Sequence, residues 1–163
     1  MSGQDAFTPE EWARIIASPM LVGMAVTAAD PGGLFSAFQE SAAVAGAIAE
    51  GRDAGNGLIA AVSGGYASPD NRAALMESIR TAIGPATAPA DVVAACETEL
   101  GRIAGIVRAK AEPDAPAFAD WLLGIARSVA EAGKEGGFLG FGGVAVSAAE
   151  TATLERLRQT LTA

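Results

Sequence analysis

The sequence contains no histidine, one cysteine and one tyrosine among its 163 residues. Histidine is the commonest general base and the commonest transition-metal ligand, so its absence excludes hydrolytic triads of the Ser-His-Asp type and argues against zinc chemistry. A single cysteine excludes an internal disulfide and a thiolate metal cluster. Cys96 lies at helical spacing from Val92 and Leu100, which predicts a buried, unreactive thiol rather than a nucleophile.

Basic residues are also few. Eleven lysines and arginines stand against nineteen aspartates and glutamates, which gives a formal net charge of −8. Nucleic-acid binding depends on neutralising phosphates, and anionic membrane surfaces attract basic segments. An acidic chain without a basic stripe is therefore a poor candidate for either partner.

Long apolar runs are missing as well. The apolar stretch from Ile15 to Ala29 has no charge, but it is shorter than the roughly 20 residues that span a bilayer. The first five residues carry no positive charge, so they do not resemble the start of an export signal. We expect a buried core helix in a cytoplasmic protein with no membrane span.

The signals that are present are those of helices. Thr8 to Glu11 forms a capping-box pattern with proline at the first helical position, and Phe7 and Trp12 are spaced for a hydrophobic staple. Ser18-Pro19 is expected to break or restart this first helix, because proline lacks the donor that an interior turn requires. Asp30-Pro31 is expected to cap the next helix.

Further stripes of apolar residues at helical spacing follow along the whole chain, and no run alternates convincingly enough for a strand. The pattern predicts an all-α fold, with six or seven helices forming an irregular bundle in one domain over residues 1–163. The expected core comprises Trp12, Ile15, Leu21, Phe38, Ile48, Ile79, Leu100, Ile103, Trp121, Ile125, Leu154 and Leu157.

The most distinctive segment lies between the last two predicted helices. Phe138, Leu139 and Phe141 stand among six glycines over residues 133–143. The segment matches neither the P-loop nor the dinucleotide-binding pattern, so we expect no cofactor. One interpretation is a long connection whose apolar side chains pack over the core. The other is that these three residues contact a protein partner or a second copy of the chain, since aromatic anchors dominate interface energetics.

Carboxylates offer the remaining candidate chemistry. Glu131, Glu135 and Glu150 flank the glycine-rich segment, but no calcium-loop pattern occurs, and Glu150 already fits a capping box with Ser147. Whether a metal binds is left open. Glu99 and Arg102 are interpreted as part of a solvated helix face. No catalytic residue is predicted and we expect no enzyme; the alternative is an enzyme that uses carboxylates alone for acid/base chemistry.

The C-terminal third resembles the tellurite-resistance TerB family. In that family an apolar helix ends in an acidic residue and glycine, and a helix with an [ST]-x-x-E start and spaced leucines follows. Ile125-Ala126 to Glu135-Gly136, then Ser147 to Glu150 with Leu154 and Leu157, is similar to this pattern. The resemblance implies an all-helical fold and a divalent cation held by acidic residues, as in a stress-response protein. This chain departs from it with Glu135 in place of aspartate and with an expanded loop. Residues 121–150 also resemble an uncharacterised bacterial helical family.

Overall fold

The computed structural model describes residues 3–29, 34–135 and 147–163, with the side chains of 34–40 and 133–135 left aside. Within these residues the chain forms seven α-helices and no strand, which confirms the all-α prediction. The helices are α1 (Pro9–Ala29), α2 (Leu34–Gly51), α3 (Gly57–Gly65), α4 (Pro69–Ile83), α5 (Pro89–Lys110), α6 (Ala115–Glu135) and α7 (Ala148–Thr162). Two short 3-10 helices, Gln4–Ala6 and Glu112–Asp114, precede α1 and α6.

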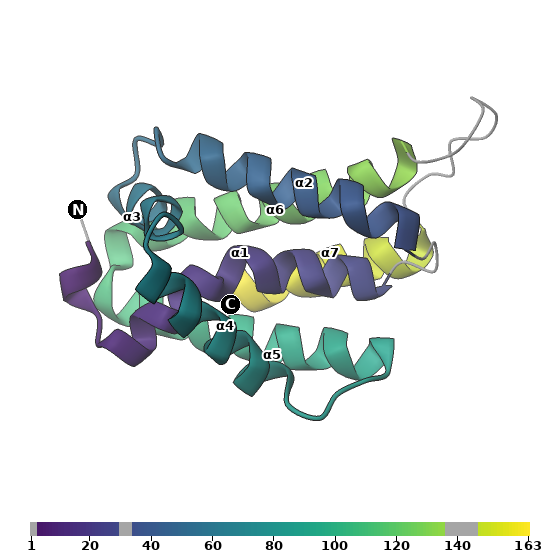
Figure 1. Cartoon of the computed structure of the whole chain (residues 1–163), viewed down its shortest axis with the longest axis horizontal. Coiled ribbons are helices and arrows are strands. Elements are labelled where there is room, and N and C mark those ends of the chain that lie inside the picture. Colours follow the sequence, from purple (N-terminus) through teal and green to yellow (C-terminus); the bar gives the residue numbers. More distant parts are fainter. Residues whose placement is uncertain (1–2, 30–33, 136–146) are drawn as a thin grey trace.

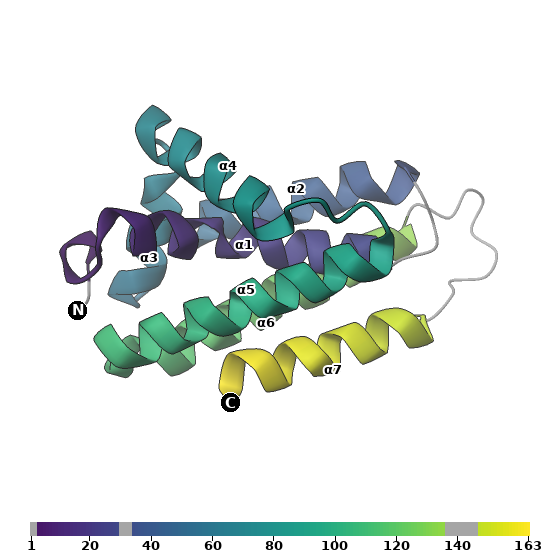
Figure 2. The ribbon, with the colours of Figure 1, turned by 90° about the horizontal axis from the view of Figure 1, so that it is seen from below.

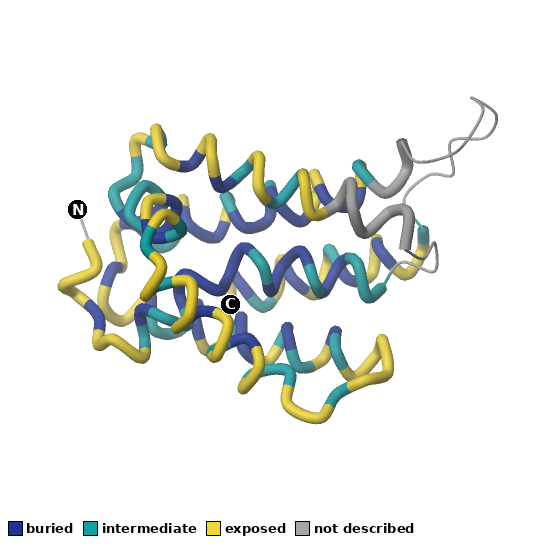
Figure 3. The backbone as a smooth tube through the Cα atoms, viewed as in Figure 1, coloured by how far each residue is buried: buried dark blue, intermediate teal, exposed yellow. Residues whose placement is uncertain are grey.

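Helix α1 is the central element of the bundle. It packs chiefly against α5, α6 and α4, and also against α2 and α7 (Figure 1, Figure 2). A helix surrounded in this way must be apolar on most of its circumference, and the uncharged run from Ile15 to Ala29 meets that demand. By length and composition α1 also passes as a membrane-spanning candidate, with 67% of its most apolar window buried in the bundle. Figure 3 shows the corresponding band of buried residues along α1.

Helix α1 begins as the sequence predicts. The Thr8 N–H donates to Glu11 Oε2 at 2.8 Å, and the Glu11 N–H donates to Thr8 Oγ1 at 3.2 Å. The rings of Phe7 and Trp12 stack with their centroids 6.1 Å apart, which is the expected staple across the first turn.

The prediction of a break at Ser18-Pro19 is wrong. Pro19 is a buried residue inside a continuous helix. Because proline has no N–H, the carbonyl of Ile15 loses its helical donor. The Ser18 hydroxyl replaces it, since Ser18 Oγ donates to the Ile15 carbonyl at 2.7 Å. The serine therefore removes the unsatisfied buried acceptor that would have made an interruption favourable.

Most of the predicted core is buried. Trp121 and Leu154 are only half-buried and lie at the edge of the core cluster, and the side chain of Phe38 lies outside the described residues. Trp121 is too large to be enclosed at the margin between α6 and the end of α2. There a Cβ on Gly51 would stand 3.1 Å from the Trp121 ring and 2.2 Å from Ser63 Oγ. This crowding explains why a glycine ends α2.

Candidate functional site

The three residues predicted as contacts, Phe138, Leu139 and Phe141, lie outside the described residues, as does the Asp30-Pro31 cap. The helices that flank the glycine-rich segment are described. Helix α6 ends and α7 begins at the same end of the bundle, which is also the end where α1 stops (Figure 1, Figure 2). The described helix ends on both sides of the predicted contact segment therefore lie at the end of the bundle where α1 stops.

The start of α7 is fixed by a capping box. The Ser147 N–H donates to Glu150 Oε2 at 2.7 Å, and the Glu150 N–H donates to Ser147 Oγ at 3.1 Å. Glu150 is buried and engaged in this role, while Glu131 is exposed. Among the residues that the structure describes, no three acidic or cysteine side chains come together as a metal-binding group. The TerB-like cation hypothesis stays a prediction from the sequence.

A groove opens beside the C-terminal half of α1, and we call it the Met groove. It has a cavity volume of about 380 Å³. Helix α1 supplies most of its lining, α2 contributes one wall and α5 the other. The described lining residues are Met20, Gly23, Met24, Thr27, Ala28, Ser41, Val44 and Val92.

The Met groove is apolar and partly open. Met20, Met24, Val44 and Val92 pack against the core cluster yet are only half-buried. Thr27 and Ser41 add two hydroxyl groups, and the described lining contains no charged residue. Methionine is unbranched and polarisable, so a pair of methionines offers a surface that adapts to differently shaped apolar groups.

The close approach of α1 and α2 sets the shape of this groove. An ideal Cβ placed on Gly23 would lie 2.7 Å from Val44 Cγ2. Only glycine therefore allows the two helices to approach at this level. The sequence predicts that Met20, Gly23 and Met24 lie in a buried core helix. In the sequence these positions carry flexible or small side chains, but the stripe on α1 alone does not reveal the groove.

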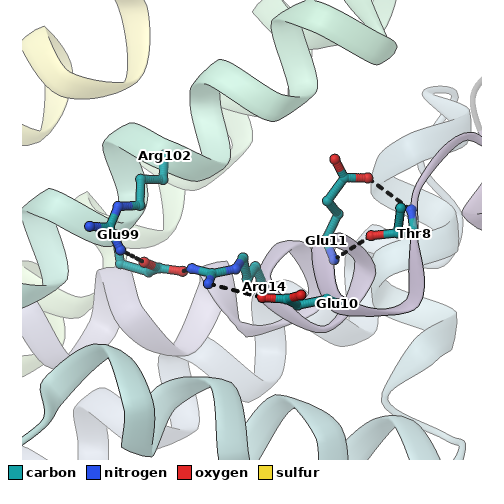
Figure 4. Close-up of polar contacts among 6 residues, drawn as sticks. All are labelled: Thr8, Glu10, Glu11, Arg14, Glu99 and Arg102. Atoms are coloured by element: carbon teal, nitrogen blue, oxygen red, sulfur yellow. Dashed lines mark hydrogen bonds and ion pairs between the residues drawn. The ribbon is translucent and has the colours of Figure 1, made fainter.

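A polar cluster lies on the N-terminal half of α1 (Figure 4). Arg14 Nη1 donates to Glu99 Oε1 of α5, and Arg14 also pairs with Glu10 at 3.4 Å. Arg102 Nη1 reaches Glu99 Oε2 at 3.4 Å. The hydrogen bond to Glu99 raises the pKa of Arg14 above its ordinary value, although burial opposes the shift.

Glu99 corrects the expectation of a solvated face, because it is only 2% exposed. It lies three residues after Cys96 and four before Ile103, on the same side of α5 as the apolar stripe. This position in the sequence is the feature from which the burial of Glu99 could have been predicted. Two guanidinium groups neutralise the carboxylate, and the cluster ties α1 to α5.

Among the described residues, the two carboxyl groups with a clearly shifted pKa, Glu11 and Glu155, both have it lowered by hydrogen bonds. Burial, with a smaller contribution from Glu97, raises the pKa of the Cys96 thiol to about 11, which keeps it protonated at neutral pH. The Lys110 ammonium lowers the pKa of Glu11 through a side-chain hydrogen bond, helped by the backbone N–H of Thr8. A catalytic acid would instead need its pKa raised toward neutrality.

Comparison with protein-family models, curated proteins and solved structures found no match for this chain. The site must therefore be interpreted from its own geometry.

Proposed function

We propose that the protein acts by association with another macromolecule, without catalysis. The observation that supports this proposal is the Met groove, a half-open apolar surface whose described lining is uncharged, on a chain with a net charge of −8. Apolar hollows lined by methionine suit contacts with partners. Burial of each additional 100 Å² of apolar surface there contributes roughly 2.5 kcal/mol before the costs of association are subtracted.

The glycine-rich segment belongs to the same proposal. Phe138, Leu139 and Phe141 stay predicted contacts with a protein partner or a second copy of the chain. Their support is the placement of the flanking helix ends, which lie at the end of the bundle where α1 stops. If both phenylalanines are anchors, the double substitution Phe138→Ala, Phe141→Ala leaves the melting temperature near normal and reduces association.

The experiment uses a photoreactive methionine analogue placed either at position 24, in the Met groove, or at position 76. Met76 is the matched control, because it is an exposed methionine on α4 that is absent from the groove lining (48% exposed). We expect a cross-linked macromolecular adduct from position 24 alone. An excess of unlabelled protein should suppress the adduct, whereas an excess of a folded Met24→Lys variant should not. Equal labelling at both positions, or labelling that no competitor suppresses, would contradict the proposal.

A further inference from the structure

The Met groove has the length and the pattern of a helix-binding site. Its α1 wall runs from Met20 to Ala28, which corresponds to about 12 Å, or roughly two helical turns. Met20, Met24 and Thr27 follow one another at spacings of four and three residues and so share one face of α1. A partner helix with apolar residues at i, i+4 and i+7 presents a stripe of the same period and length.

The residues that line the groove fit the same occupant. Val44 of α2 and Val92 of α5 line the groove on either side of α1, while Gly23 and Ala28 provide positions with little or no side chain. Ridges of a partner helix pack into hollows of this kind, formed between rows of larger side chains. The methionines can change rotamer to fit the incoming apolar groups.

Charge decides which kind of helix would bind. The chain carries −8 overall, and Asp91, which is exposed, stands next to Val92 at the start of α5. A second copy of this acidic chain would meet a like charge, which opposes self-association. A helix with lysine or arginine on its outer face would instead be attracted, and its apolar face would enter a groove whose described lining is uncharged.

From these features we infer that the Met groove binds a basic amphipathic helix of a partner protein. This inference rests on the proposed function and specifies its partner. It assigns a role to Met20 and Met24, which remain half-buried where α1 meets α2 and α5.

The test measures the binding of three synthetic peptides by fluorescence anisotropy to the full chain. Each peptide is about 16 residues long, which is long enough to form a helix that covers the groove. The first has leucines at i, i+4 and i+7 with lysines elsewhere, the second replaces the lysines by glutamates, and the third scrambles the first. We expect the first peptide to bind at least about tenfold more tightly than the other two.

Variants then locate the site. Met24→Lys should weaken binding of the first peptide by about tenfold or more, because it places a charge in the apolar groove and repels the lysines. Met76→Lys makes the same change in net charge away from the groove and should leave the affinity unchanged. Met24→Leu should retain binding. If circular dichroism shows that Met24→Lys does not fold, Val92→Lys tests the opposite wall of the groove.

Each remaining outcome overturns the inference. If the scrambled peptide binds as tightly as the first peptide, charge alone accounts for the attraction. If the acidic peptide binds as tightly as the first, the charge of the partner does not determine binding. Self-association that Met24→Lys abolishes would refute the basic partner while leaving association through the groove intact. If no peptide binds and the cross-linking at position 24 also fails, the proposed function falls together with the inference.

Discussion

The two halves of α1 belong to one continuous helix but have different surroundings. In residues 9–18 the bulky side chains of Trp12, Ile15 and Ile16 are buried, and directional polar bonds fix the helix in place. Arg14 is tied to Glu99 of α5, and the Tyr66 hydroxyl donates to the Ile16 carbonyl at 2.6 Å. The burial of that hydroxyl raises the pKa of Tyr66 above its ordinary value.

In residues 19–29 one face of the helix is still sealed, with Leu21, Val22 and Val26 buried. The other face carries Met20, Gly23 and Met24 and borders the Met groove. The difference teaches that branched residues and directional polar bonds close a helix surface, whereas small and unbranched residues leave it adaptable. The following predictions test this contrast.

The largest difference is expected between two truncations on α1. Ile16→Ala removes a fully buried side chain from the closed half and should lower the free energy of unfolding by about 2–5 kcal/mol. Met24→Ala removes a half-buried side chain from the groove wall, so we expect a loss of only about 1 kcal/mol. Urea denaturation monitored by circular dichroism measures both values. Similar losses would mean that the two halves are equally packed.

The next effect concerns the ion pair that ties α1 to α5. Glu99→Ala leaves Arg14 without its buried partner, which costs several kcal/mol when both groups are enclosed. Because the Arg14 side chain is 25% exposed and can turn toward water, we expect a loss of about 1–3 kcal/mol. Glu77→Ala removes a carboxylate from an exposed pair with Arg80 and should cost less than about 0.5 kcal/mol. Equal losses in the free energy of unfolding, measured by urea denaturation, would show that the buried pair stabilises the protein no more than the exposed pair does.

Substitutions at two glycines distinguish the effect of close helix packing on stability from the effect of helix propensity. Gly23→Ala introduces a Cβ against Val44 and should destabilise the protein by about 1 kcal/mol. A Cβ on Gly46 of α2 meets nothing within 4 Å, so Gly46→Ala should stabilise by about 0.5–1 kcal/mol through helix propensity. Val44→Ala should rescue Gly23→Ala, and thermal melts of the double-mutant cycle measure that coupling. If the effects of the two substitutions on stability are simply additive, contact with Val44 is not the reason why position 23 requires glycine.

The smallest effect is a dependence on pH. The folded-state pKa of Glu11 lies below its ordinary value of 4.5, chiefly because of the hydrogen bond from Lys110. The resulting stabilisation is complete above pH 4.5 and is lost as the pH falls through the lowered pKa. Lys110→Met should therefore reduce the fall in melting temperature on acidification. The described lining of the Met groove has no titratable residue, so Met24→Leu should leave the pH profile unchanged.

Much of the helical architecture could be predicted from the sequence, because caps and apolar stripes are local signals. The capping boxes at Thr8 and Ser147 depend on residues within one turn, and the structure shows both. Tertiary effects were missed. Ser18 rescues the helix at Pro19, and Glu99 finds Arg14 across 85 positions of sequence. The Met groove arises only where three helices meet, so no single stripe could reveal it.

The most direct test of the central claim follows the methionine methyl groups by NMR. The chain has only four methionines, and three of them, Met20, Met24 and Met76, lie in the described helices. On addition of the basic helical peptide, we predict that the methyl signals of Met20 and Met24 shift while that of Met76 stays in place. Unshifted signals at positions 20 and 24, or a shift at Met76 alone, would contradict binding in the Met groove.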